Sequence, residues 1–104
     1  KLAECDQQGV KPFAVVVTLG LTVTGGYDPM REIVEICKPR DMHIHVDAAW
    51  GGGIALTDDA PKHLACIRDA DTVIWDCHKW FHAPLTCTAL LVPNVAILKH
   101  TFNT

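Results

Sequence analysis

Alternating polar residues in His43-Ile-His45-Val-Asp47 have a spacing that suits metal coordination. Alternate residues of a β-strand project to one face, so two imidazoles and a carboxylate would lie together there. The signal is weak, because no further histidine or acidic residue follows at short spacing, and alternate polar residues commonly line the less buried side of a strand. A metal-dependent hydrolase built on His43, His45 and Asp47 is therefore an outside alternative.

Asp47 and Lys79 form a second pair of chemically useful residues. Asp47 begins Asp47-Ala-Ala-Trp-Gly-Gly-Gly53, directly after an apolar run, and Lys79 ends Trp75-Asp-Cys-His-Lys79, just past another. Ligands of open α/β sheets bind beyond the carboxyl ends of the strands. We therefore expect Asp47 and Lys79 to reach the same crevice.

Strands and helices alternate among the elements that must position this pair. The continuous apolar and β-branched run at residues 13–17 is typical of a strand covered on both faces. Residues 42–46, 72–75 and 86–92 predict three further strands. Helices are expected at residues 1–8 and, as a short helix with Leu64 and Ile67 inward, at 59–69. The order strand, helix, strand predicts a right-handed βαβ unit with parallel strands, and hence the α/β class.

A further helix is predicted between the first two strands. Asp28 is expected as its N-cap and Pro29 as its first residue, and Pro39 ends it. Apolar residues then recur at the spacing of one buried helix face, at Met30, Ile33, Val34 and Cys37.

Length, composition and charge narrow the class of protein. The 104 residues suffice for one domain or for part of a larger one, and the content of 49% hydrophobic residues excludes disorder. A net charge of −3 with scattered charges predicts neither a nucleic-acid nor a membrane partner, and no apolar run approaches the ~20 residues of a membrane span. Five cysteines without a CxxC pair favour a reducing, cytoplasmic setting. Because the chain begins with Lys1 rather than Met, we expect it to begin inside a longer protein.

Five linked motifs cover nearly the whole chain. In order they are Gly9-Val-Lys-Pro-Phe-Ala-Val-Val-Val17, Thr18-Leu-Gly-Leu-Thr-Val-Thr-Gly-Gly-Tyr-Asp-Pro29, His45-Val-Asp-Ala-Ala49, Asp71-Thr-Val-Ile-Trp-Asp-Cys-His-Lys79 and Pro84-Leu-Thr-Cys87. Together they resemble the group II pyridoxal-phosphate-dependent amino acid decarboxylases, which act on glutamate, aromatic amino acids, diaminobutyrate and cysteine sulfinate. The resemblance implies that residues 1–104 are an incomplete part of one large domain, a fragment of the mainly parallel sheet of fold type I pyridoxal-phosphate enzymes.

The resemblance also implies a role for each of five residues. Lys79 matches the lysine that holds the pyridoxal 5'-phosphate aldehyde as a Schiff base, and Asp47 matches the carboxylate that keeps the ring nitrogen protonated. Ala49 matches the small residue against one face of the ring. His78 matches a residue near the phosphate, and Thr22 matches a cofactor-contacting threonine in the Gly-rich turn.

The function implied is decarboxylation of an L-amino acid to an amine and carbon dioxide by a cytoplasmic homodimer. The fragment alone is expected to be inactive, and which amino acid is the substrate stays open. Another fold type I enzyme, a desulfurase, lyase or aminotransferase, is an alternative, although Trp75-Asp-Cys-His-Lys79 with Pro84 and Cys87 favours the decarboxylases. A non-catalytic paralogue is a further alternative, against which the presence of both Asp47 and Lys79 argues.

Three residues depart from the family pattern. Leu21 replaces a second threonine. Asp76 stands where many members have asparagine, which puts a phosphate contact in doubt because two anions repel. Cys77 replaces the usual proline or alanine, and a thiol there is either an apolar filler, which we favour, or an oxidation-sensitive neighbour of the site.

Overall fold

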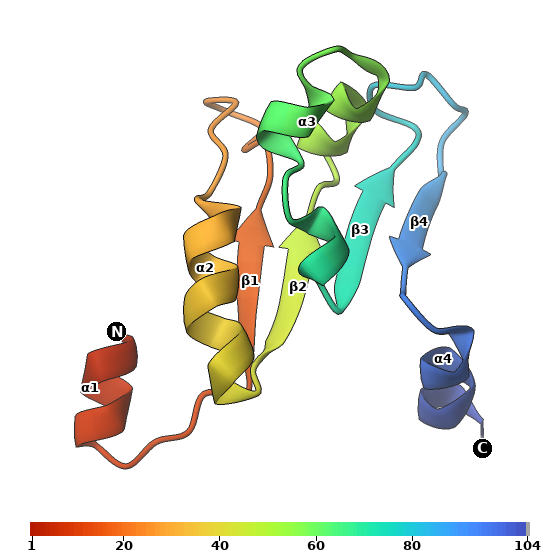
Figure 1. Ribbon diagram of the computed structural model, residues 1–104. Helices are drawn as coiled ribbons and strands as arrows, with labels where there is room; N and C mark the ends of the chain where they lie inside the picture. The colour runs from red at the N-terminus through yellow and green to blue at the C-terminus, as the bar shows by residue number, and fades with distance from the viewer. Residues whose placement is uncertain (104) are drawn as a thin grey trace.

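Four strands form one sheet in the order β1-β2-β3-β4 (Figure 1). The computed structural model describes residues 1–103. The first three strands are parallel and β4 is antiparallel to β3, which confirms the α/β class and the mainly parallel sheet. The elements are α1 (Leu2–Gln7), β1 (Ala14–Thr18), α2 (Met30–Cys37), β2 (His43–Asp47), α3 (Ala60–His63), β3 (Thr72–Asp76), β4 (Thr88–Leu91) and α4 (Val95–Phe102), with 3₁₀ helices at Lys38–Arg40, Gly51–Leu56 and Ile67–Asp69.

The core lies between the sheet and α2. Val17, Ile44 and Val46 are fully buried, and the register places Val17 beside Val46. Met30 and Cys37 of α2 are buried against these strands, while Ile33 and Val34 pack at the edge of the core. The predicted apolar face of this helix is therefore confirmed. Leu19, the first residue after β1, is also fully buried.

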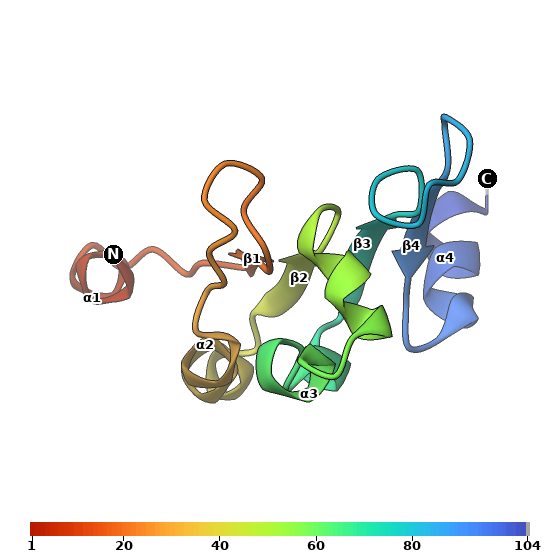
Figure 2. The ribbon, with the colours of Figure 1, turned by 90° about the horizontal axis from the view of Figure 1, so that it is seen from above.

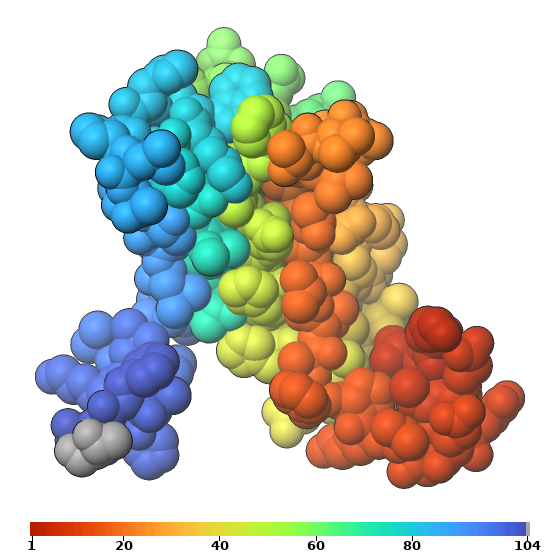
Figure 3. All heavy atoms as spheres, turned by 180° about the vertical axis from the view of Figure 1, so that it is seen from behind, coloured from red at the N-terminus to blue at the C-terminus, as the bar shows by residue number. Residues whose placement is uncertain are grey.

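Helices cover one face of the sheet. Figure 2 shows α2 and α3 on one side, whereas the loops that follow β1 and β3 curve toward the other side. Seen from that other side, the strands are bare along much of their length (Figure 3). Val16, which points there, is 63% exposed, and Phe13 is 84% exposed. The expectation of a strand covered on both faces is therefore wrong for the described residues, because these residues supply only one covering layer.

The predicted cap of α2 is also wrong. The helix begins at Met30, and Pro29 keeps a non-helical ψ of 76°. Asp28 binds β1 instead: its Oδ2 accepts a hydrogen bond from Thr18 N at 2.7 Å, and its own N–H donates to Thr18 O at 3.0 Å. The carboxylate thus closes the loop between β1 and α2 and is not available to the helix.

The remaining boundaries differ from prediction at the turns. The helix expected at residues 59–69 is broken, because Cys66 adopts a left-handed φ of 67° between α3 and the following 3₁₀ helix. Leu64 and Ile67 still pack against the core as expected. The last strand is shorter than residues 86–92. No helix within residues 1–103 is long and apolar enough to cross a membrane.

Candidate functional site

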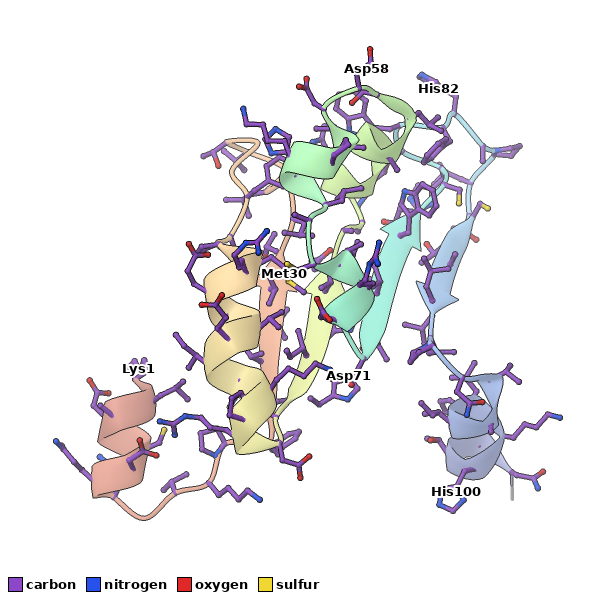
Figure 4. The ribbon with its side chains drawn as sticks, viewed as in Figure 1. Lys1, Met30, Asp58, Asp71, His82 and His100 are labelled. Carbon is purple, nitrogen blue, oxygen red and sulfur yellow. The ribbon has the colours of Figure 1, made fainter. Side chains whose placement is uncertain are left out.

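The carboxyl ends of β2 and β3 bring Asp47 and the segment 76–79 to one edge of the sheet. These strands are parallel neighbours, Asp47 ends β2, and Asp76 ends β3. Asp47 is held by the strand on its other side as well, because Leu19 N donates to its carbonyl oxygen at 2.9 Å. Figure 4 shows His82 beyond this edge and Asp71 at the opposite edge. The structure thus places Asp47 and Lys79 at the same edge, as the sequence predicted.

The Asp47 side chain points to the helix-free face of the sheet. Ile44 and Val46 are buried beneath α2, so the alternating neighbours His45 and Asp47 face the other way. Asp47 Oδ1 accepts a hydrogen bond from Ala49 N at 3.1 Å. Within residues 1–103, Oδ2 of Asp47 has no hydrogen-bond partner. One carboxylate oxygen therefore orients the side chain, and the other is left to bind a ligand.

Lys79 forms an ion pair inside its own turn. Its Nζ lies 2.7 Å from Asp76 Oδ2, and its side chain is 30% exposed. Thr88 Oγ1 donates to the other oxygen, Asp76 Oδ1, at 2.6 Å. The hydrogen bond from Lys79, and after it the one from Thr88, lowers the pKa of Asp76 below its usual value. Asp76 is thus ionised at neutral pH and pairs with the Lys79 side chain.

His78 is anchored to the residue that precedes β4. Its Nδ1 lies 3.0 Å from Cys87 O and 3.3 Å from Cys87 N, and the tautomer decides which of the two is bonded. Its Nε2 lies 3.9 Å from Asp76 Oδ2. The ring therefore spans the turn after β3 and the approach to β4, which fixes the direction of the backbone just before Lys79.

Three glycines let the exit of β2 pack closely against the segments that follow β1 and β3. A Cβ at Gly52 would lie 2.6 Å from Trp75 Cδ1, and one at Gly53 would lie 2.5 Å from Trp80 Cγ. A Cβ at Gly51 would collide with the carbonyl oxygen of Leu19. Close backbone approach at this segment therefore sets where Trp80, and with it the adjacent Lys79, stands relative to Asp47.

Lys79 lines a cavity of about 390 Å³ together with Trp50, Trp80 and His82. Trp50 and Trp80 meet edge to face, with ring centroids 5.7 Å apart. Both rings also line a neighbouring cavity of about 260 Å³ beside Gly20 and Tyr27. Lys79 lines this cavity, and Asp47 ends the neighbouring strand β2. An amine and a carboxylate so placed fit the groups that pyridoxal phosphate requires.

The five residues predicted for the cofactor fall into separate groups. Asp47 and Ala49 share a hydrogen bond, and His78 and Lys79 meet at Asp76. Thr22 lies in an exposed turn. Across residues 1–103, no hydrogen bond or ion pair joins these groups to one another. Their cofactor roles therefore stay predictions.

The metal alternative gains no support from the described part of the chain. His43 Nε2 and His45 Nδ1 lie 3.0 Å and 2.7 Å from one atom, the Thr72 hydroxyl oxygen. Asp47 is bonded to Ala49 instead. Within residues 1–103, no three His, Cys, Asp or Glu side chains gather as a metal site.

Sequence reasoning missed several residues of this site. The residue type of Asp76 predicts only repulsion of a phosphate, although its spacing of three residues from Lys79 is a signal for an ion pair. Thr88 could be found only with the register of β3 and β4, which pairs it with Asp76. Trp50 and Trp80 carry no sequence signal for their contact.

Known proteins resemble this chain in both sequence and structure. The family model described as pyridoxal-dependent decarboxylase conserved domain matches residues 1–104. Mouse CSAD in apo form is 39% identical with a TM-score of 0.83, over 89% of this chain and 20% of that one. The glutamate decarboxylase domain of diaminobutyrate-pyruvate transaminase and L-2,4-diaminobutyrate decarboxylase from Vibrio parahaemolyticus is 33% identical with a TM-score of 0.89, over 97% of this chain and 22% of that one.

A plant enzyme is similar to the same extent. Catharanthus roseus tryptophan decarboxylase in complex with L-tryptophan is 31% identical with a TM-score of 0.89, over 99% of this chain and 22% of that one. The chain thus spans about a fifth of the length of each of these three proteins.

Proposed function

Because the chain belongs to the pyridoxal-dependent decarboxylase family, we propose that it is the lysine-bearing part of an enzyme that converts an L-amino acid to an amine and carbon dioxide. One observation carries the proposal: Lys79 opens into a cavity at the edge of the sheet where Asp47 ends the neighbouring parallel strand. Residues 1–104 would be part of one large cofactor-binding domain.

Each residue has a stated task in this proposal. Lys79 Nζ would hold the cofactor through its aldehyde, and the carboxylate of Asp47 would hold its ring nitrogen in the protonated form. The bound cofactor supplies an electron sink for the bond that breaks at the substrate α-carbon. Ala49 would leave room beside the ring, and His78 and Thr22 would help to hold the cofactor.

Asp76 adds a step that precedes cofactor binding. A lysine amine attacks an aldehyde only in its neutral form. The ion pair holds Nζ of Lys79 at 2.7 Å from Asp76 Oδ2. Lys79 must therefore leave Asp76 before it takes up the cofactor.

The assembly and location of the whole protein are proposed on separate grounds. A homodimer is supported by the family resemblance alone. A cytoplasmic location is supported by the five cysteines, all of which are free. The scattered negative charge supports small amino acids, rather than nucleic acids or membranes, as partners.

The substrate must be found by assay, because the relatives are named for different amino acids. Full-length protein with pyridoxal phosphate should release carbon dioxide from one member of a panel of L-amino acids. Lys79→Ala should abolish this release, and Lys62→Ala in α3 is the matched control that should retain it. Release by the Lys79→Ala variant would contradict the proposal, and a keto acid or sulfide as product would favour another fold type I reaction.

A further inference from the structure

Residues 77–87 form the loop that joins β3 to β4 and carries Lys79. Cys77 and Cys87 are the first and last residues of this loop. We propose that Cys77 and Cys87 close into a reversible disulfide when the protein meets a peroxide, and that this bond fixes the loop that carries His78 and Lys79. The disulfide goes beyond the proposed function and does not depend on it, whereas its effect on Lys79 rests on the proposed role of that residue.

The two cysteines stand directly beyond the paired ends of β3 and β4. These strands pair Trp75 with Ala89 and Asp76 with Thr88. Continued by one residue, this antiparallel register would bring Cys77 opposite Cys87. A backbone hydrogen bond of 3.2 Å from His78 N to Cys87 O joins the two segments at this point. Directly opposed residues have Cα atoms about 4.5–5.5 Å apart, within the range of about 4.4–6.8 Å that a disulfide requires.

Cys87 is the more accessible of the two thiols. Burial, and after it a hydrogen bond with the Cys87 side chain, raises the pKa of the Cys77 thiol. Cys87 is exposed and Cys77 is half-buried. Because the thiolate is the reactive form and must be reached by the oxidant, Cys87 is the thiol that a peroxide attacks first. Cys77 is then the neighbour that resolves the product.

The remaining cysteines lack such a partner in the sheet. Cys37 is the last residue of α2 and is buried in the core. Cys5 lies on α1, and Cys66 lies between α3 and the 3₁₀ helix Ile67–Asp69. None of the three has a cysteine opposite it in the strand register of residues 1–103. They therefore serve as internal controls for the oxidation.

The chemistry balances with one peroxide molecule. The Cys87 thiolate attacks a peroxide oxygen, the O–O bond breaks, hydroxide leaves, and Cys87 becomes a sulfenic acid. The Cys77 thiolate then attacks this sulfur, forms the S–S bond and displaces a second hydroxide. The two protons released by the thiols convert the hydroxides to two water molecules. Both sulfurs are oxidised, and the peroxide is reduced.

The disulfide would add a covalent link beside the contacts that hold Lys79. Asp76 binds Lys79 through Oδ2 and Thr88 through Oδ1, and Cys77 and Cys87 are the adjacent residues. Ala83 N also donates to Cys77 O at 3.1 Å across the loop. With both ends of the loop tied, Lys79 is kept near Asp76. Oxidised protein should therefore take up cofactor more slowly than reduced protein.

Peptide mapping of the full-length protein tests the disulfide. Apo-protein is treated with hydrogen peroxide, its free thiols are blocked with N-ethylmaleimide, and it is cleaved with trypsin. Cleavage after Arg68, Lys79 and Lys99 places Cys77 in peptide 69–79 and Cys87 in peptide 80–99. We expect these two peptides to be linked, with the loss of two hydrogens, and to separate on reduction with dithiothreitol. The link should vanish in Cys77→Ser and persist in Cys66→Ser.

Other results would overturn the inference. If both thiols are alkylated after peroxide, or if Cys87 ends as a sulfinic acid without a link to Cys77, the pair is not a disulfide site. If the link forms but the rate of cofactor uptake is equal in oxidised and reduced protein, the effect on Lys79 is wrong. If reduced protein never takes cofactor on Lys79, the proposed function fails while the mapped disulfide stands.

Discussion

The Nζ atom of Lys79 lies 2.7 Å from Asp76 Oδ2, and the second oxygen of the same carboxylate binds the Thr88 hydroxyl at 2.6 Å. β3 and β4 therefore both contribute to the position of the lysine. The ion pair must break before the amine of Lys79 can react with an aldehyde.

Asp76→Asn should speed the uptake of pyridoxal phosphate by full-length apo-protein at neutral pH. The amide keeps the hydrogen bond to Thr88 but removes the ion pair that holds Lys79 Nζ at Asp76. Uptake is measured by the rise of the visible absorption band after cofactor is added. Asp58→Asn, in an exposed segment, is the control and should behave as the wild type. Slower or unchanged uptake in Asp76→Asn would contradict the account.

The ion pair should stabilise the fold over a defined pH range. Because the folded pKa of Asp76 is lowered, its contribution is fully present above the unfolded value of about 4 and is lost as pH falls through the folded pKa. The free energy of unfolding of wild type and Asp76→Asn, measured with urea, should differ by a constant amount from pH 7 to about 4.5 and converge below.

Thr88→Val provides the matched variant for this pH dependence. It removes the second hydrogen bond that lowers the pKa of Asp76 and leaves the bond to Lys79. The folded pKa of Asp76 should then lie closer to the unfolded value, so the loss of stability should be smaller than in the wild type and complete at a higher pH. A difference between wild type and Asp76→Asn that grows as pH falls below 4 would have the wrong sign.

Asp47→Asn should slow turnover far more than it weakens cofactor binding. The amide oxygen can still accept the hydrogen bond from Ala49 N, so the turn after β2 is preserved. The lost charge removes an electrostatic stabiliser, for which a decrease of roughly 10²-fold or more in kcat is expected. Steady-state kinetics and cofactor titration separate the two effects. Turnover equal to that of wild type would show Asp47 to be only structural.

Gly53→Ala should destabilise the protein by about 1–3 kcal/mol through overpacking. The added methyl group would lie 2.5 Å from Trp80 Cγ, too close to the backbone for the ring to swing away. Gly26→Ala is the matched control, because its nearest neighbour would be Thr24 Oγ1 at 3.2 Å, the end of an exposed side chain. Urea unfolding measures the free energy of unfolding of both variants. Equal values for the two would show that the segment after β2 can accommodate a methyl group at residue 53.

The sequence predicted the strands well because their apolar runs are local signals. Residues 13–17, 42–46 and 72–75 each coincide with a strand to within one residue at either end. The stripe of Met30, Ile33, Val34 and Cys37 likewise predicted which face of α2 is buried. The edge that holds Asp47 and Lys79 followed from the order of these elements.

What the sequence did not reveal depends on contacts between distant segments. Asp28 has the residue type of a helix cap, but its carboxylate binds the backbone N–H of Thr18 instead. Asp76 gains its second partner, Thr88, only once β4 lies antiparallel to β3. The sequence singles out Cys77 by its residue type, but only this register brings Cys87 near it.

Reduction of the loaded full-length protein with borohydride tests the central claim most directly. The reagent converts a lysine-bound cofactor into a stable amine linkage, which mass spectrometry of the digested protein assigns to one residue. The account predicts a single modified residue, Lys79, and no modification in Lys79→Ala. A cofactor found on Lys62 or Lys99 instead would contradict the assignment of Lys79.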